Sequence, residues 1–401
     1  MKTVYLEKNL PKMLAVKVFS KISKSAYFAP YSPVVFKSMP DQPLPRDNWV
    51  RVKNKLTGIC GSDLSLFKVA PQTSIAMVPL PGSQKTFFGH ETVGEVIETG
   101  PAVKSVKVGD RVVMTMFLGN CHIKDIHPLC ARCRAGDYVQ CENYGEPSPK
   151  DLENTGAGLG DTYIGPEIQV MKIPDGISDE EAVMMEPAAV GVHAALRAAP
   201  KKGDKVLLLG AGAIGLCVIQ ALRALYPECT VYVYQHSRFK RELALKMGAH
   251  EAIGGDLYKE TARITGAHYY EGMMNNRMLM GGFDMVFDCI GTPQMMHDSL
   301  RIVRAKGRII KIGAKMAPTK FDETPLWWQE IDIIGINGYA TEQIDGREIT
   351  TFELVREMIL DGRLQLNDMI TQRYKLSEYK EAFKHMIYHS NEVVKVAVEI
   401  D

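Results

Sequence analysis

The chain has 401 residues, of which 46% are hydrophobic and 24% charged, and its formal net charge is +1 at pH 7. This length predicts two domains, because a single domain usually contains ~100–200 residues, and the composition is ordinary for a globular protein. A net charge near zero argues against nucleic-acid binding, since proteins of that class usually carry a strong basic excess. We therefore expect a globular protein with no nucleic-acid partner.

Two features of the sequence bear on its location. The first residues, Met1 to Lys8, are too polar for a signal peptide. The most apolar stretch, 206–225, contains three glycines and Arg223, which favours a buried strand, turn and helix over a membrane span. We expect a cytoplasmic protein without a membrane-spanning segment.

The first 180 residues are predicted to be rich in β-structure. Glycine, proline and β-branched residues are frequent there, and the segments 49–53 and 110–114 alternate between apolar and polar side chains as strands do. Turns that contain Gly100 and Gly109 separate segments of this kind.

From about residue 180 the pattern changes to alternating helices and strands. The expected helices are 179–199, 214–225, 238–247 and 294–303, and the expected strands are 205–210, 231–234, 283–288 and 308–312. Strands that alternate with helices predict a doubly wound parallel sheet. Mixed segments follow from about residue 335 and end with a strand at 393–399.

A glycine-rich turn follows the strand predicted at 205–210. It reads G-x-G-x-x-G and comprises Gly210, Ala211, Gly212, Ala213, Ile214 and Gly215. Between a strand and a helix, such glycines permit a tight turn and the close approach of a pyrophosphate to the positive end of the helix. The turn therefore predicts a dinucleotide site, and a glycine-rich turn without a ligand is the weaker interpretation.

The end of the second strand bears on which dinucleotide binds. An acidic residue there would hold the ribose 2′-hydroxyl of NAD, but this position is Gln235. Cationic residues follow, beginning with Arg238, and a planar guanidinium suits a 2′-phosphate. We expect NADP; the alternative is NAD held by Gln235, with the cations on a solvated helix start.

Two groups of metal-ligand residues lie in the β-rich half. Cys60, His90 and Glu91 supply a thiolate, an imidazole and a carboxylate, which are the donors of catalytic zinc sites that keep one position open. The chain has eight cysteines, and three of them within 130–141 follow the spacing C-x2-C-x7-C. In a long chain without an export signal, clustered cysteines indicate a closed structural zinc site rather than disulfides.

These motifs, in this order along the chain, resemble those of the zinc-containing medium-chain dehydrogenase family, which includes alcohol, polyol, threonine and glucose dehydrogenases. The markers are G-I-C-G-S-D at 58–63, G-H-E at 89–91, the cysteine group, E-P-A-A-V-G at 186–191 and the glycine-rich turn. The resemblance covers nearly the whole chain. It implies an α/β fold with a GroES-like catalytic domain at 1–185, a Rossmann dinucleotide-binding domain with a doubly wound parallel sheet at 186–334, and a return to the catalytic domain at 335–401.

The resemblance also implies the ligands of a catalytic zinc ion. Cys60 and His90 match the first two ligands of the family, and the third position is Glu186. In the polyol and sugar branch, the acid beside the histidine, here Glu91, is the alternative direct ligand, with the other acid holding zinc through water. Both assignments stay open at this stage.

The family's structural zinc site has four cysteines, and this chain departs from that pattern. His127 stands at the first position, ahead of Cys130, Cys133 and Cys141. Zinc accepts a site of three cysteines and one histidine. Cys121 is the rival fourth ligand, although its use would require a longer loop between ligands, and we favour His127.

The reaction implied by the family is hydride transfer between a secondary alcohol and a nicotinamide coenzyme. We expect a polyol, a sugar or an amino alcohol, or the matching ketone, as the substrate. Zinc would acidify the bound alcohol in a cleft between the domains, at the carboxyl ends of the sheet strands. Ser62 is expected to be the hydroxyl nearest the substrate. Ser65 replaces a histidine of many relatives, and serine can pass a proton but cannot store one near neutral pH.

The alternative to this enzyme is a non-catalytic or zinc-free relative, either crystallin-like or quinone-reductase-like, which would be expected to lack the catalytic ligands. The family resemblance also implies a homodimer or homotetramer. The methionine-rich stretch from Tyr269 to Gly282 looks like an insertion in the coenzyme domain, and we expect packing or an interface there, because methionine fills irregular gaps.

Overall fold

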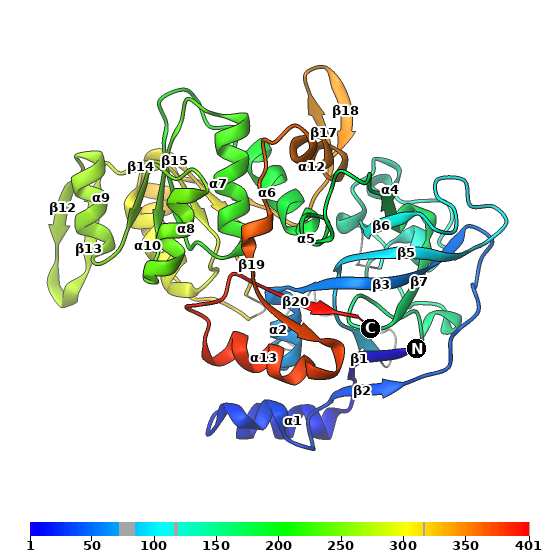
Figure 1. The fold of residues 1–401 in the computed structure, drawn as a ribbon. Coiled ribbons are helices and arrows are strands. Elements are labelled where there is room, and N and C mark those ends of the chain that lie inside the picture. Colours follow the sequence, from blue (N-terminus) through cyan, green and yellow to red (C-terminus); the bar gives the residue numbers. More distant parts are fainter. Residues whose placement is uncertain (72–84, 116–118, 316, 401) are drawn as a thin grey trace. The chain divides into compact units, whose positions relative to one another are not determined.

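The computed structural model describes residues 1–71, 85–115, 119–315 and 317–400 (Figure 1). The chain divides into two compact units. Unit 1 comprises residues 1–186, 339–360 and 366–401, and unit 2 comprises residues 187–338 and 361–365.

Besides one two-stranded hairpin, the described part of unit 1 contains two sheets in which most neighbouring strands are antiparallel. The larger sheet has the order β19-β20-β3-β5-β6-β8, with β7 paired to β3, and the smaller sheet has the order β2-β1-β4. The larger sheet comprises β3 (Trp49–Ile59), β5 (Glu91–Thr99), β6 (Arg111–Met114), β7 (Thr162–Pro166), β8 (Val170–Lys172), β19 (Ile370–Lys375) and β20 (Lys395–Glu399). The smaller sheet comprises β1 (Lys2–Glu7), β2 (Val34–Ser38) and β4 (Lys85–Phe87).

The strands of unit 1 form where β-branched side chains alternate with polar ones. Val50 and Val52 on β3 pack with Val96 on β5 and Val112 on β6 in one buried cluster, because branched side chains pack well on a pleated surface. The helices of this unit are α1 (Leu10–Phe19), α2 (Gly61–Phe67), α3 (Cys121–Lys124), α4 (Ala131–Arg134), α5 (Asp179–Val183), α12 (Thr351–Leu360) and α13 (Tyr379–Tyr388). A hairpin of β17 (Thr341–Ile344) and β18 (Arg347–Thr350) precedes α12.

Unit 2 is organised around a six-stranded parallel sheet with the order β11-β10-β9-β14-β15-β16. Its strands are β9 (Lys205–Leu209), β10 (Thr230–Tyr234), β11 (Glu251–Ile253), β14 (Phe283–Asp288), β15 (Val303–Lys311) and β16 (Asp332–Gly335). The central strand β9 has the sequence Lys-Val-Leu-Leu-Leu with four consecutive buried residues, which is typical of a parallel strand covered on both faces. The strand order reverses between β9 and β14.

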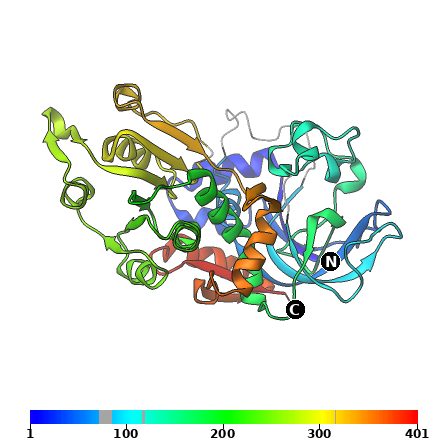
Figure 2. The same cartoon turned by 90° about the horizontal axis from the view of Figure 1, so that it is seen from above.

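Helices cover both faces of this sheet (Figures 1 and 2). They are α6 (Met185–Ala198), which begins in unit 1, α7 (Ala213–Leu225), α8 (Arg238–Lys246), α9 (Leu257–Thr265), α10 (Pro293–Ile302) and α11 (Thr324–Trp328). Tyr258 on α9 and Leu300 on α10 pack in one core cluster with Leu207 of β9. A β-carbon on Gly191 of α6 would lie 2.7 Å from the side chain of Cys217 on α7, so these two helices pack closely. The predicted fold class, a β-rich part with a doubly wound parallel sheet, is confirmed.

Several elements differ from those expected in the sequence. The helix expected at 179–199 is two helices, because α5 ends at Val183 and α6 begins at Met185. Helix α1 was not expected, although Asn9 caps it by accepting a hydrogen bond from the backbone of Lys12 at 3.2 Å, a signal readable in sequence. Strand β11 and helix α9 were also missed.

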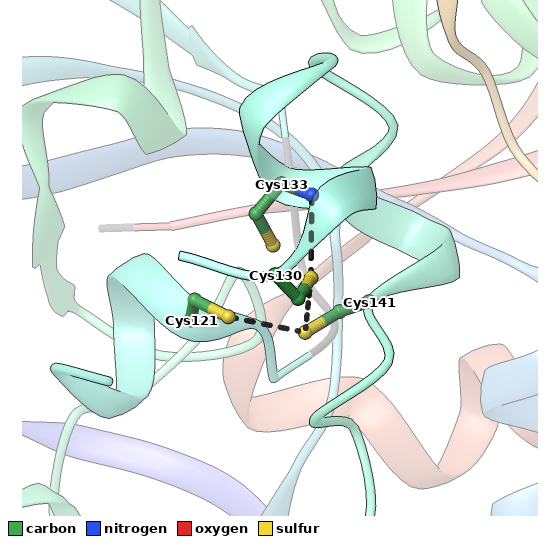
Figure 3. A group of neighbouring side chains, drawn as sticks. All are labelled: Cys121, Cys130, Cys133 and Cys141. Carbon is green, nitrogen blue, oxygen red and sulfur yellow. Dashed lines mark hydrogen bonds between the residues drawn. The ribbon is translucent and has the colours of Figure 1, made fainter. Parts of the chain in front are cut away.

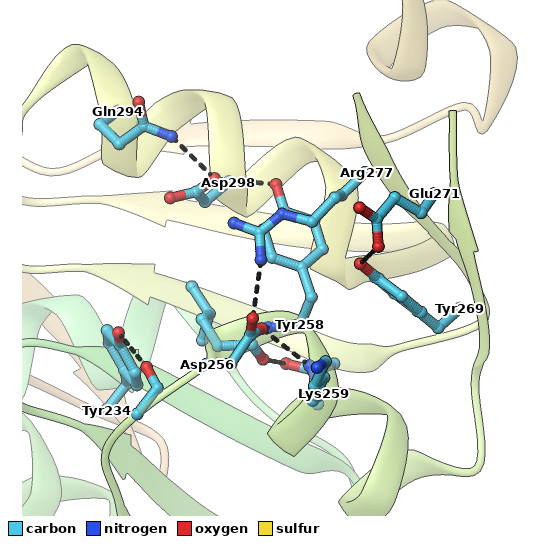
Figure 4. Close-up of polar contacts among 12 residues, drawn as sticks. Tyr234, Asp256, Tyr258, Lys259, Tyr269, Glu271, Arg277, Gln294 and Asp298 are labelled. Atoms are coloured by element: carbon cyan, nitrogen blue, oxygen red, sulfur yellow. Dashed lines mark hydrogen bonds and ion pairs between the residues drawn. The ribbon is translucent and has the colours of Figure 1, made fainter. Parts of the chain in front are cut away.

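The methionine-rich insertion forms a hairpin of β12 (His268–Glu271) and β13 (Arg277–Met280) (Figure 4). The guanidinium of Arg277 lies 4.2 Å from the ring centre of Tyr258 and donates to Asp256 at 2.9 Å. Tyr258 in turn donates to the buried Asp298 on α10 at 2.8 Å. The hairpin therefore contacts the start of α9 through an ion pair and a cation–π contact, and Tyr258 links α9 to α10. Met274 at the tip of the hairpin is fully exposed.

The described part of the chain has no helix long and apolar enough to cross a membrane.

Candidate active site

Three residues that can bind a metal ion meet at one end of the larger sheet of unit 1. Cys60 follows β3 at the start of α2, and His90 and Glu91 stand at the start of β5. β3 and β5 are antiparallel neighbours, so the end of one lies beside the beginning of the other. One ligand atom of each residue lies within 4.8 Å of the others. His90 and Glu91 are buried.

Asp63 joins the two segments that carry this group. Its carboxylate accepts a hydrogen bond from the backbone of Cys60 and another from the backbone of Gly89, each at 3.0 Å, and it lies 3.7 Å from Nδ1 of His90. Gly89 has φ +86°, and a β-carbon there would lie 2.6 Å from the backbone nitrogen of Leu159. This position therefore requires glycine.

A buried cation accompanies the group. Lys395 on β20 donates to both carboxylate oxygens of Glu91, at 2.6 and 2.5 Å, and the two side chains are 4% and 0% exposed. Burial alone lowers the pKa of Lys395, but the charges of Glu91 and Cys60 outweigh it and hold this pKa above its ordinary value. A β-carbon on Gly58 would lie 2.3 Å from Oε2 of Glu91, so the pair fits only beside glycine.

Glu186 adds a second buried acid. Burial raises the pKa of its carboxyl to about 8, with the charge of Glu91 adding to the shift and His90 opposing it. Burial likewise raises the pKa of the Cys60 thiol to about 11. The charged forms of Glu186 and Cys60 are therefore both disfavoured at this place.

Tyr339 is a residue that sequence reasoning missed. Its side chain is 7% exposed, and its hydroxyl has no hydrogen-bond partner among the described residues. Burial and the charge of Glu186 together raise the pKa of this phenol. Ser62 lies half-buried on the first turn of α2, and Ser65 donates to the carbonyl of Gly61 at 3.0 Å.

Four cysteines form the second metal-binding group (Figure 3). They are Cys121, Cys130, Cys133 and Cys141, and their sulfur atoms all lie within 4.8 Å of one another. The sulfur of Cys141 lies 3.6 Å from that of Cys121 and 3.9 Å from that of Cys130. Lys124 nearby is 5% exposed and donates to three backbone carbonyls of the segment 143–146.

The structure corrects the sequence-based choice of His127 for this group. Asn120 caps α3 and Asp125 ends it in the left-handed region, so this single turn directs Cys121 inward. His127 comes in the loop after that turn, its side chain is 70% exposed, and its Nε2 lies 3.4 Å from Asp125. Cys121, and not His127, therefore lies with the other three thiols.

The glycine-rich turn of unit 2 has the shape that a dinucleotide requires. Gly210 has φ +98°, and a β-carbon on Gly215 would lie 2.1 Å from the Gly210 carbonyl oxygen, so strand and helix approach as closely as the motif demands. A β-carbon on Gly212 would meet nothing within 4 Å. The space beside Gly212, at the N-terminus of the 13-residue helix α7, fits a phosphate held by helix N–H groups.

The residues after β10 are Gln235 to Arg241. Ser237 caps α8, and the Gln235 side chain accepts from the Ser237 backbone at 3.2 Å. Arg241 donates to the carbonyl of Gln235 at 2.8 Å. Arg238 is 86% exposed and pairs with Glu242 at 2.7 Å.

Comparison with known proteins defines the family. A model described as an alcohol dehydrogenase GroES-like domain matches residues 46–175, and one described as a zinc-binding dehydrogenase matches residues 213–353. L-idonate 5-dehydrogenase from Vitis vinifera is 30% identical over 345 residues, which cover 84% of each chain. L-threonine 3-dehydrogenase from Pyrococcus abyssi is 30% identical over 86% of this chain and 90% of its own. A crystal structure of an oxidoreductase/dehydrogenase of unknown specificity from Escherichia coli has a TM-score of 0.72 at 25% identity, and covers 92% of this chain and 95% of that one.

A thiol–imidazole–carboxylate group that could hold a metal ion in one unit, and a glycine-rich turn on a parallel sheet in the other, are the features of a metal-dependent dehydrogenase. The chain belongs to the zinc-containing medium-chain alcohol dehydrogenase family. The predicted family is confirmed, and with it the predicted activity of an alcohol oxidoreductase that uses zinc and a nicotinamide coenzyme. The alternative of a non-catalytic or zinc-free relative is not favoured.

The buried acid Glu186 predicts a pH dependence of stability in metal-free protein. Its pKa rises from an ordinary value of 4.5 to about 8 in the folded chain, so the folded state binds more protons than the unfolded state between these values. Stability should therefore fall as pH rises through this window. Glu186→Gln should flatten the decline in denaturant unfolding measured with a chelator present. An unchanged slope in the variant would contradict the assignment.

Proposed function

We propose that the substrate is a polyol, sugar or amino alcohol, oxidised at a secondary hydroxyl, or the matching ketone. The group of Cys60, His90 and Glu91 carries the proposal, because it assembles zinc donors in unit 1. The names of the two sequence relatives place L-idonate and L-threonine among the substrates of those proteins. Tyr339 adds support, because a buried phenol without a partner gains from a substrate hydroxyl.

We further propose that Cys60, His90 and Glu91 are the three protein ligands of the catalytic zinc. Donors that bind one zinc ion at about 2.0–2.3 Å lie within about 4.6 Å of one another, and the ligand atoms of these three residues lie within 4.8 Å of one another. A carboxylate has about four lone-pair sites, so Glu91 can bind zinc while it accepts from Lys395. When bound, the zinc ion acts as a Lewis acid that lowers the pKa of a coordinated hydroxyl.

Glu186 has a separate proposed role. It is buried, yet it does not belong to the group of three ligand atoms among the described residues. A carboxyl group whose pKa is raised to about 8 exchanges a proton near neutral pH, as a general base must. We assign to Glu186 the proton that leaves the alcohol, and to Ser62 contact with the substrate hydroxyl.

Cys60→Ser tests the function. We expect turnover to fall more than about 100-fold, since disturbing even the outer partners of a metal ligand costs 10–100-fold, while coenzyme affinity stays nearly unchanged. The measurements are zinc content, steady-state rates on idonate, threonine and simple polyols with each coenzyme, and fluorescence titration with NADPH and NADH. Cys229→Ser, which removes a buried thiol outside both cysteine-containing groups, is the control. Retained turnover, or a parallel loss of coenzyme binding, would refute the role of Cys60.

We propose that the four-cysteine group holds a structural zinc ion. Cys121→Ser should then release about one zinc ion per chain on dialysis, since a closed zinc site has four protein ligands, and it should lower the melting temperature. His127→Ala should leave both quantities unchanged, because its exposed imidazole lies apart from the thiols. If His127→Ala loses zinc and Cys121→Ser does not, the site consists of three cysteines and one histidine instead.

We propose NADP as the preferred coenzyme. No carboxylate stands at Gln235 to repel a 2′-phosphate, and Arg238 follows at the start of α8. The surface pair of Arg238 with Glu242 contributes little stability, so its guanidinium is available to a phosphate. A homodimer or homotetramer is proposed on the family resemblance.

Arg238→Ala should separate the two coenzymes. We expect the KM for NADPH to rise about tenfold, the equivalent of one charge-assisted contact of about 1.4 kcal/mol, while the KM for NADH changes little. Arg238→Lys should give an intermediate value, since lysine keeps the charge without the planar fork. Equal changes for both coenzymes would refute the proposed preference.

A further inference from the structure

A buried ion pair lies at the carboxyl end of the parallel sheet in unit 2. Asp288 is the last residue of β14 and Lys311 the last of β15, and they are partners in the strand register. The Asp288 side chain is fully buried, Lys311 is 26% exposed, and the lysine donates to Oδ2 of the aspartate. Neither residue was singled out in the sequence.

Asp288 also holds the loop that follows β14. Its Oδ1 accepts hydrogen bonds from the backbones of Ile290 at 3.0 Å and Gly291 at 2.7 Å. The side chain of Ile290 reaches Gly210, where a β-carbon would lie 2.7 Å from Cγ1 of Ile290. A single carboxylate therefore sets the loop that borders the glycine-rich turn.

The same residue holds the loop that follows β15. The main-chain carbonyl of Asp288 accepts from Ile312 at 3.1 Å and from Gly313 at 2.7 Å. The two loops touch through their backbones, because a β-carbon on Gly313 would lie 2.3 Å from the nitrogen of Gly291. A displacement of one loop would thus move the other.

The place of these loops in the sheet is the one where a coenzyme is expected to bind. In open parallel sheets, ligands bind outside the carboxyl ends of the strands where the strand order reverses, and here it reverses between β9 and β14. The loop after β9 carries Gly210, and the loops after β14 and β15 carry Gly291 and Gly313. We propose that Asp288 and Lys311 are positioning residues for the nicotinamide coenzyme, an inference that rests on the proposed function.

The pair acts through loop shape. A buried ion pair is weak support for stability, because desolvation offsets much of the attraction, whereas loss of one partner leaves an uncompensated charge. Without Lys311, the Asp288 carboxylate is drawn toward water, and the N–H groups of Ile290 and Gly291 lose a fixed acceptor. The coenzyme must then order both loops when it binds, and its affinity falls.

The same two strands supply a matched control. At their amino ends Arg304 of β15 donates to Asp284 of β14 at 2.6 Å, and Asp284 also accepts from the backbone of Lys205 at 2.7 Å. This second pair joins the same strands at the opposite edge, with side chains that are 43% and 24% exposed. Arg304→Met therefore measures the structural effect of a lost pair.

The experiment compares Lys311→Met with Arg304→Met in the zinc-loaded enzyme. We expect Lys311→Met to raise the dissociation constants of NADPH and NADH about tenfold, the equivalent of one lost charged hydrogen bond, and to raise KM more than it lowers kcat. Hydrogen exchange at residues 290–291 should also quicken. Arg304→Met should leave both dissociation constants within about twofold while lowering the melting temperature.

Two further variants keep the result interpretable. Lys311→Arg preserves the cation and should restore most of the affinity, and Asp288→Asn, if it folds, should weaken binding at least as much as Lys311→Met. Unchanged affinity in Lys311→Met, or an equal loss in Arg304→Met, would overturn the positioning role alone. A wild-type enzyme that binds neither coenzyme would overturn this inference together with the proposed function.

Discussion

The pairing of Lys395 with Glu91 is the contact on which the proposed catalytic zinc site of unit 1 depends. It joins strands from positions 304 residues apart in the chain, and it places one cation beside two buried acids and the half-buried thiol of Cys60. Lys395 opposes the rise in the pKa values of Glu186 and Cys60 that burial causes, and zinc requires deprotonated ligands. The lysine therefore favours the charged form of Cys60, one of the proposed zinc ligands.

Several unusual positions follow from this arrangement. Gly58 leaves the space that the Glu91 carboxylate occupies, and Gly89 adopts a backbone conformation that brings His90 to the start of β5. Asp63 then ties the Cys60 and His90 segments through backbone N–H groups, as outer partners of metal ligands commonly do. The geometry of the ligands is thus held by hydrogen bonds to the backbone rather than by side-chain packing alone.

The sequence predicted the parts of this architecture that are local, and missed those that depend on tertiary pairing. The glycine-rich turn and the alternation of strands and helices are local patterns, so the parallel sheet and its turn were predictable. Lys395 was not, because it appears as one polar residue in an apolar strand and its partner lies far away in the sequence. His127 satisfied the family spacing and Cys121 required a longer loop between ligands, and only the single turn of α3, capped by Asn120, decides which of them lies with the thiols. The unpartnered phenol of Tyr339 has no sequence signal at all, since burial and hydrogen bonding are properties of the folded chain.

The two lysine–carboxylate pairs share one physical role. Each pair joins a fully buried acid to a lysine from another strand, Glu91 to Lys395 and Asp288 to Lys311. Each pair also lies where a ligand is proposed to bind. Surface pairs such as Arg238 with Glu242 contribute little to stability, and buried pairs contribute less than their attraction suggests. What a buried pair does supply is a fixed charge and a fixed set of backbone contacts before the ligand arrives. Preorganisation of this kind lowers the cost of ordering the site on binding, which explains why costly buried charges stand at these two edges.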